Sequence, residues 1–365
     1  MKNQTKINKI RASISHRLSI WMVLFAGLIF ITVIGYMFYD SHRLVREEAH
    51  ARAELVLDNT IEHVGDIFTE AEKAVDNMDW IIHKDLDTPK RMFEYSIRIL
   101  RNNPMLYGCS IAFEPDFYPE YGKYFSVYSN NGGHKAGKIT THQEGSDEYN
   151  YFDMDWYRRP KESGEALWIG PYVDYDPVEG VTDRIISYGK PLYRNPGQIV
   201  GVLSVDISLP QLSQAVTSVR PYPHSYTILL DREGTFLAHP DTTRLYYQNL
   251  YSNTNDRPDP ELRALGEDMV HGRKGLRSLQ VDGEDCYVYY GPLSNTGISV
   301  ALVCPREDIY GNFFKFRLRS LLIVGFGMLV MLIMTEYVIR RVLSRKWEKA
   351  ADQEEIPGEG TPKGE

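Results

Sequence analysis

Two long apolar segments frame this chain, one near each end. Residues 18–39 carry no charged side chain, and residues 318–339 carry only Arg319 and Glu336, one close to each end. A helix of about 20 predominantly apolar residues is long enough to span the hydrocarbon core of a bilayer. The two segments are therefore predicted to be transmembrane helices that hold the sequence between them on one side of a membrane.

Basic residues flank each segment on the side of the nearer chain terminus. They are Lys2, Lys6, Lys9, Arg11 and Arg17 before the first segment, and Arg340, Arg341, Arg345, Lys346 and Lys349 after the second. Because positively charged flanks stay on the cytoplasmic side, both termini are predicted to be cytoplasmic, as an N-terminus of residues 1–17 and a tail of residues 340–365. Because the end of that tail is rich in Asp, Glu, Gly and Pro, the whole of residues 340–365 is predicted to be disordered.

A cleaved signal peptide is the alternative for the first segment. Its apolar stretch exceeds the usual 7–15 residues of such a signal, and residues 36–39 are Tyr-Met-Phe-Tyr where cleavage needs small residues. These two features favour an uncleaved anchor in a bacterial inner or plasma membrane, with the middle of the chain outside the cytoplasm.

A long helix is predicted for residues 41–83, directly after the first apolar segment. Its apolar residues alternate spacings of four and three, as in the seam of a coiled coil: Leu57, Ile61, Val64, Phe68, Ala71, Val75 and Met78. Two interpretations stay open. The stripe is the seam of a homodimer or the face by which the helix packs on its own domain, and with Ile67 and Ala74 flanking it, it is wide enough to serve as both.

The rest of the external sequence reads as two groups of short strands, each accompanied by helices, which predicts an α+β fold with two modules. Residues 84–215 contain strands near 105–113, 124–128, 138–142, 168–173, 185–193 and 199–207, with helices at 88–102 and 209–216. Residues 216–310 contain strands near 226–230, 235–238, 276–281, 286–290 and 298–303, with a helix at 260–271.

The three cysteines constrain the fold only weakly. Cys286 and Cys304 flank a predicted hairpin turn at residues 293–297, so the two side chains could lie opposite each other. A disulfide and a pair of buried thiols both remain open, and Cys109 has no evident partner.

The sequence contains no catalytic motif with a complete set of residues. No Cys/His cluster has the spacing of a metal site, and neither a phosphate-binding glycine loop nor a nucleophile elbow occurs, so no metal, cofactor or catalytic residue is predicted. His239-Pro240-Asp241 is the triplet that most resembles a catalytic one, but a turn that ends a strand is the favoured explanation. A net charge of −8 argues against nucleic acid as a partner.

Aromatic and acidic residues gather in residues 149–157 and 168–174 and again at Asp206. Aromatic faces attract positive charge, and a desolvated carboxylate forms a charge-assisted hydrogen bond, so this mixture suits a site for a small cation or amine. Tyr172 and Asp174 are two apart on a predicted strand and should share a face. The alternative, that Trp156 and Trp168 are core residues and the acids cap turns, stays open.

The order of these elements, together with several short motifs, resembles the double Cache extracytoplasmic sensor domain of bacterial transmembrane receptors. The motifs are Asp155-Trp156-Tyr157, Trp168 with Pro171-Tyr172-Val173-Asp174, residues 201–207, and Gly234 with His239-Pro240-Asp241. The resemblance covers roughly residues 45–305. It implies two tandem PAS-like antiparallel-sheet modules, of which the membrane-distal one, 84–215, binds the ligand and the membrane-proximal one, 216–310, relays the signal.

The resemblance also implies which residues contact the ligand. Positions that match the amino-acid-binding members of the family are Tyr149, Trp156, Tyr157, Tyr172, Asp174 and Asp206. Met154 stands where those members carry an arginine that holds the ligand carboxylate, and methionine cannot donate the bidentate hydrogen bonds of a guanidinium. An amine or an uncharged metabolite is therefore expected rather than an α-amino acid, unless Arg158 or Arg159 reaches in from a neighbouring position.

The expected function is that of a membrane receptor without enzymatic activity. Its predicted partners are a small-molecule ligand, a second copy of the chain, and a cytoplasmic kinase, phosphatase or chemoreceptor-type output in chemotaxis or two-component signalling. The short sequence after the second apolar segment predicts either a stand-alone sensor or a truncated receptor. Two other classes remain: an exported, membrane-tethered hydrolase that uses His239 and Asp241, and a protein-binding scaffold.

Overall fold

The computed structural model describes residues 2–132, 138–175, 182–218, 220–250, 259–294 and 296–354. Internal contacts divide the chain into two compact units. The larger unit is His50–Asp308, and the smaller one combines the segments on either side of it.

A six-stranded antiparallel sheet begins the larger unit, with strand order β3-β2-β1-β6-β5-β4. Its strands are β1 (Gly108–Phe113), β2 (Ser126–Asn130), β3 (Thr140–Glu144), β4 (Leu167–Tyr175), β5 (Thr182–Asn195) and β6 (Gln198–Ser208). The 3-10 turns η1 (Pro119–Tyr121) and η2 (Tyr151–Asp153) lie in its connections. We call this sheet, with helices α2 (Lys90–Asn102) and α3 (Asp155–Ser163), the first module.

The two helices of the first module lie on opposite faces of its sheet. Ser96 of α2 shares a hydrogen bond with Ser129 of β2, 2.7 Å between the hydroxyl oxygens. Tyr128, the next residue back along β2, points to the other face, where it lines a cavity together with Trp156 of α3. This second face of the sheet is therefore the one available to a small molecule.

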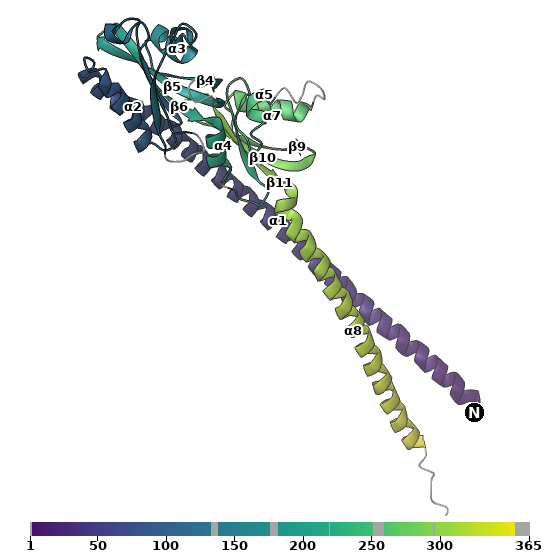
Figure 1. Ribbon diagram of the computed structural model, residues 1–365. Coiled ribbons are helices and arrows are strands. Elements are labelled where there is room, and N and C mark those ends of the chain that lie inside the picture. Colours follow the sequence, from purple (N-terminus) through teal and green to yellow (C-terminus); the bar gives the residue numbers. More distant parts are fainter. Residues whose placement is uncertain are drawn as a thin grey trace, which may run out of the picture. The chain divides into compact units, whose positions relative to one another are not determined.

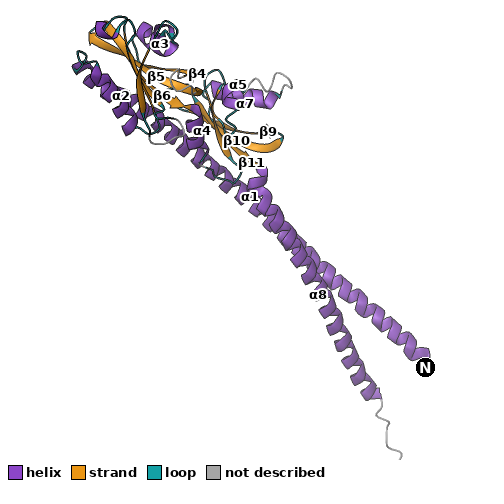
Figure 2. Cartoon of the chain, in the orientation of Figure 1, coloured by secondary structure: helices purple, strands orange, loops and turns teal. Residues whose placement is uncertain are grey.

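A five-stranded antiparallel sheet follows, with strand order β8-β7-β11-β10-β9. We call it the second module, and it consists of β7 (Tyr226–Leu230), β8 (Phe236–Ala238), β9 (Gly275–Val281), β10 (Glu284–Pro292) and β11 (Ser299–Pro305) with helices α5 (Arg244–Tyr247) and α7 (Pro260–Val270). Helix α4 (Leu209–Thr217) continues directly from β6 and packs on β7 and β8. The two sheets confirm the α+β fold of tandem PAS-like modules that the sequence predicts (Figure 2).

Helix α1 (Lys2–Lys84) contributes its second half to the larger unit, where it runs along both sheets (Figure 1). Near its start in this unit, the ring of His50 meets that of Tyr289 in β10 at 5.8 Å between centroids. Further along, Phe68 packs on Trp168 of β4 at 4.6 Å between ring centroids. The Lys190 ammonium of β5 then pairs with Asp76, 2.8 Å from nitrogen to oxygen.

These contacts bury the apolar stripe of α1. Leu57, Val64, Phe68, Ala71, Val75 and Met78 are all buried within the larger unit, and Ile61 is partly buried. The interpretation that the helix packs on its own domain is thereby confirmed. A homodimer stays a prediction, and its contacts would have to come from other surfaces.

Strands β10 and β11 form the hairpin that the sequence predicts, with Asn295 of the turn outside the described residues. The register pairs Tyr287 with Cys304 and Cys286 with Pro305. Because neighbouring residues of a strand face opposite sides of the sheet, Cys286 and Cys304 point to opposite faces. Both are buried free thiols, as is Cys109, so no disulfide links the hairpin.

The smaller unit contains the two apolar segments, within α1 and α8 (Arg306–Glu354). Both are long and apolar enough to cross a membrane, with mean hydropathy 2.3 and 2.2 over their most apolar windows. Side chains such as Trp21, Phe25, Ile323 and Phe326 are largely exposed, as lipid-facing residues would be. Helix α8 extends to Glu354, so the prediction of a disordered tail is wrong for residues 340–354, and residues 355–365 lie outside the described part.

The packing of α1 leads to a stability prediction. Phe68→Ala should lower the free energy of unfolding of the full chain by about 3 kcal/mol or more, because Phe68 is fully buried against Trp168. Leu55→Ala is the matched control, since Leu55 is 61% exposed on the same helix and its loss should cost less than about 0.5 kcal/mol. Denaturant unfolding of the chain in nanodiscs measures both, and equal small effects would mean that the stripe is not part of the core.

Candidate functional site

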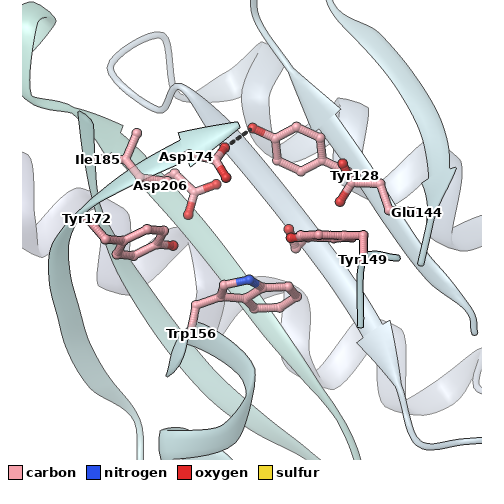
Figure 3. A pocket seen from close by; sticks show the side chains of 9 residues that line it. Tyr128, Glu144, Tyr149, Trp156, Tyr172, Asp174, Ile185 and Asp206 are labelled. Carbon is pink, nitrogen blue, oxygen red and sulfur yellow. Dashed lines mark hydrogen bonds between the residues drawn. The ribbon is translucent and has the colours of Figure 1, made fainter. Parts of the chain in front are cut away.

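A small cavity lies on the α3 side of the first sheet. It is lined by Ser110, Tyr128, Glu144, Tyr149, Trp156, Tyr172, Asp174, Ile185 and Asp206. Its volume, about 10 Å³, gives room for roughly one water molecule. Figure 3 shows the rings of Tyr149, Trp156 and Tyr172 grouped around the carboxylates of Asp174 and Asp206, with Glu144 beside Tyr128.

Asp206 of β6 is the most deeply buried acid of this cavity, with 4% of its surface exposed. The Ser187 hydroxyl of β5 donates to it at 2.5 Å, and the Tyr172 hydroxyl shares a hydrogen bond with the same serine at 2.6 Å. Burial raises the pKa of the Asp206 carboxyl to about 7; Asp174 and Glu144 add to the rise, and the Ser187 hydrogen bond opposes it. Near neutral pH this acid therefore changes its charge.

Glycine at position 108 is what leaves space for this arrangement. Gly108 of β1 is paired with Asp206 of β6 in the sheet. A Cβ atom at Gly108 would lie 2.5 Å from the Asp206 Oδ2 atom and 2.8 Å from the Tyr128 hydroxyl oxygen. Any larger residue would therefore push these two polar groups apart.

A register shift in β4 turns Tyr172 and Asp174 toward the cavity. The pairing with β5 is interrupted between Ile169 and Tyr172. Trp168 points to the α1 side, where its indole N–H donates to the Glu72 carboxylate at 2.8 Å. Without the extra residue, Tyr172 would share that face, because side chains alternate along a regular strand.

Two further acids come from the edges of the sheet. The Tyr128 hydroxyl donates to Asp174 at 3.4 Å, and the Nε2 atom of His142 lies 3.2 Å from the Glu144 carboxylate. Burial, followed by the negative charges of Asp174 and Asp206, raises the pKa of Tyr128 well above its ordinary value. Tyr128 therefore stays protonated and keeps its hydrogen to donate.

Five of the predicted site residues line the cavity, namely Tyr149, Trp156, Tyr172, Asp174 and Asp206, while Met154 and Tyr157 do not. Tyr157 is fully buried behind Trp156, and its hydroxyl donates to Glu114 at 2.6 Å. Met154 is 38% exposed at the start of α3. Arg158 is also exposed, and its guanidinium pairs with Asp155 at 2.5 Å.

Ser110, Tyr128, Glu144 and Ile185 line the cavity although the sequence did not single them out. They belong to four different strands, and only the register of the sheet brings them together. The one local signal was Glu144, an acid two residues after the strand predicted near 138–142, whose side chain proves to be buried, with 8% exposed.

His239 and Asp241 form a turn and do not act as a pair. The Nδ1 atom of the buried His239 ring accepts the Asp241 backbone N–H at 2.9 Å. The Asp241 carboxylate accepts instead from the backbone and hydroxyl of Thr243. Burial and the nearby Arg244 lower the pKa of His239 to about 4, so the ring is neutral. The part of the chain that the structure describes also contains no group of three or more potential metal ligands.

Known proteins match this chain over the same region. Residues 94–214 match the family model of the first PDC sensor domain of methyl-accepting chemotaxis protein-like receptors. The methyl-accepting chemotaxis protein PctB of Pseudomonas aeruginosa is 21% identical over 211 residues, which are 56% of this chain and 30% of PctB. The chain thus spans less than a third of the length of that curated relative.

Solved structures share the whole external fold. The extracellular domain of the putative histidine kinase soHK1S-Z6 is 19% identical with a TM-score of 0.61, covering 74% of this chain and 99% of that one. The ligand-binding domain of the Pseudomonas fluorescens chemoreceptor CtaA, solved with L-isoleucine, is 16% identical with a TM-score of 0.52, covering 74% and 98%. Residues 94–214 are therefore a PDC sensor domain of the kind found in chemoreceptor-like proteins, and the two tandem modules have the fold of the sensor domains of chemoreceptors and histidine kinases.

Proposed function

We propose that the first module is the membrane-distal sensor of a receptor and binds a small amine in its cationic form. The observation that carries this proposal is the lining of the cavity, where Glu144, Asp174 and Asp206 converge among four aromatic rings. None of the described residues that line it is lysine or arginine. Aromatic faces and desolvated carboxylates both favour a bound cation.

An α-amino acid fits this lining less well. The solved relatives include domains with bound L-isoleucine and asparagine. Binding of the carboxylate of such ligands calls for a cationic donor, but Met154 is exposed and Arg158 is paired with Asp155. A buried carboxylate without a partner would be repelled by the acids of the cavity, which disfavours the zwitterion relative to a simple amine.

The size of the cavity implies that binding moves part of its wall. A volume of about 10 Å³ does not accommodate even a small amine with its carbon atoms. Trp156 lies in the first turn of α3, while Asp174 and Asp206 are fixed in the sheet. In our proposal the amine displaces Trp156 and the start of α3, and so favours a second arrangement of the module.

A continuous route leads from this site to the second module. Asp206 lies two residues before Ser208, whose hydroxyl caps α4 by accepting the Gln211 N–H. Ser213 of α4 then accepts the backbone N–H of His239 at 3.2 Å. In our proposal the second module is membrane-proximal, and α4 passes the change at β6 to it.

The remaining steps concern the whole protein. We propose that both termini are cytoplasmic, that residues 18–39 and 318–339 cross the membrane, and that a kinase, phosphatase or chemoreceptor-type output reads the signal. The family match and the two apolar helices support this arrangement. A homodimer is part of the same proposal. The geometry of His239 and Asp241 gives the hydrolase alternative no support.

Amine binding is tested by thermal shift of the full chain in nanodiscs. Methylamine, ethylamine and 1,4-diaminobutane should raise the melting temperature more than L-isoleucine or L-asparagine does. Asp206→Asn should weaken binding of the best amine about 30-fold or more, because a buried charge partner is lost. Asp116→Asn is the matched control, since Asp116 is exposed in the same module and lies outside the cavity. Tighter binding of an α-amino acid than of any amine would contradict the proposal.

The charge of Asp206 gives a second test, through pH. In the unfolded chain its pKa is about 3.8 and in the folded chain about 7, so the folded state holds the proton more tightly. Stability from this group is fully present below pH ~4 and is lost as the pH rises through ~7, by at most ~4 kcal/mol. Asp206→Asn should be more stable than the natural chain at pH 8 and should flatten the pH dependence.

Amine affinity should increase with pH, whereas the stability of the folded chain should decrease. Because an aliphatic amine stays charged up to about pH 10, its binding should strengthen from pH 6 to pH 8 as Asp206 loses its proton. Titrations at both pH values measure this. Equal affinities at the two values, with stability also independent of pH, would mean that Asp206 is ionised throughout.

A further inference from the structure

A second hollow lies on the opposite side of the first module, between α1 and α2. Its volume is about 360 Å³, within the range of small-molecule sites. It is lined by Glu70, Lys73, Ala74, Asn77 and Met78 from α1 and by Arg98, Ile99, Asn102, Asn103 and Pro104 from the end of α2 and the residues after it. We call it the α1–α2 groove, and it shares no residue with the acidic cavity.

Each helix contributes one polar edge to the α1–α2 groove. Lys73 and Asn77 are four residues apart on α1, as are Arg98 and Asn102 on α2, so each pair lies on one face of its helix. Glu70 lies one turn before Lys73 and Ala74. The two cations therefore belong to different walls, with Glu70 toward one end.

The polar side chains of these edges are not used by the fold. Among the described residues, the side chains of Glu70, Lys73, Asn77, Arg98 and Asn102 take part in no hydrogen bond or ion pair. Glu70 and Lys73 remain unpaired although their spacing of three residues would permit an ion pair. Five polar groups thus face a hollow without a partner in the protein.

The floor of the groove is apolar. Ala74, Met78 and Ile99 are 8%, 7% and 2% exposed, respectively, and all three line the groove. The small side chain at Ala74 and the short ones at Asn77 and Asn102 leave the space between the helices open. Protein interiors normally fill such space, so a hollow of this size with an apolar floor is suited to a ligand with an apolar body.

We propose that the α1–α2 groove is a second binding site, for a small aromatic carboxylate that carries a hydrogen-bond donor at its far end. Arg98 binds the carboxylate with its planar guanidinium, and Lys73 adds a second positive charge from the facing wall. The ring lies on Met78 and Ile99. Glu70 accepts the donor, and the carboxamides of Asn77 and Asn102 complete the rim.

This site does not depend on the proposed amine sensor. The α1–α2 groove offers cations to an anionic ligand, whereas the acidic cavity offers carboxylates to a cationic one. The lining of the groove lies on the face of the sheet away from Asp206. A ligand there would tie α2 to α1, the helix that runs along both modules, and would thereby stabilise the first module. Binding at the two sites can be measured separately because Asp206→Asn leaves the groove intact.

The probe for the experiment is 4-hydroxybenzoate, titrated calorimetrically into the full chain in nanodiscs. The comparison compounds are 4-hydroxybenzamide, which lacks the negative charge, and benzoate, which lacks the hydroxyl donor. Lys73→Gln and Arg98→Gln are the test variants; both side chains are exposed and unpaired, so folding should be unaffected. Arg101→Gln is the matched control, an exposed arginine of α2 outside the groove.

Saturable binding of 4-hydroxybenzoate is expected, at least ~10-fold weaker in Arg98→Gln and in Lys73→Gln and unchanged in Arg101→Gln and Asp206→Asn. Benzoate should bind more weakly than 4-hydroxybenzoate, and the benzamide should not bind. The proposal would be overturned by equal binding of carboxylate and amide, by binding that survives both groove substitutions, or by no saturable binding of either carboxylate. Loss of binding in Asp206→Asn alone would place the probe in the acidic cavity and would equally overturn it.

Discussion

A carboxylate buried inside a β-sheet is stable only if it is protonated, hydrogen-bonded or paired with a cation, and this constraint governs the first module. Asp206 meets it with a proton near neutral pH and with the Ser187 hydroxyl, which Tyr172 in turn contacts. Gly108 is required opposite it because any Cβ would occupy the same space. The cavity is thus built around one acid whose charge is only partly compensated by the protein, and the cationic ligand that we propose would supply the missing countercharge.

Helix α1 provides the rigid frame against which such a site can move. Its stripe is buried along both sheets, and salt bridges from Lys190 and Lys274 attach β5 and the start of β9 to its polar side. The start of α3, which moves in our proposal, lies on the other face of the first sheet and carries Trp156. Ligand-dependent change is therefore expected in α3 and β6, while the α1 side of the sheet stays fixed.

The sequence predicts nearly every strand and helix of the two modules, because apolar periodicity and turn residues are local signals. It also identifies Tyr149, Trp156, Tyr172, Asp174 and Asp206, since the aromatic and acidic residues are dense there. It does not predict that Glu144 and Tyr128 join them, because β2 and β3 reach Asp206 only through the pairing of β1 with β6, which is distant in sequence. The sequence also does not predict that Tyr157 lies outside the cavity. Its neighbour Trp156 lines the cavity, while the Tyr157 hydroxyl donates to Glu114. The helical stretch 340–354 was missed because its polar composition resembles that of a disordered tail.

The turn at His239 takes part in the relay that we propose between the two modules. The His239 ring is neutral and accepts the backbone N–H of Asp241, which fixes the conformation of the turn at the end of β8. The rigid turn presents the His239 N–H to Ser213, and α4 begins at the Ser208 cap, two residues after Asp206. Packed elements of this kind shift as bodies because their interiors are nearly incompressible. In our proposal a displacement of β6 at Asp206 is transmitted to β8 through this helix of nine residues, by the hydrogen bond at its Ser208 cap and by that of Ser213 in the middle of the helix.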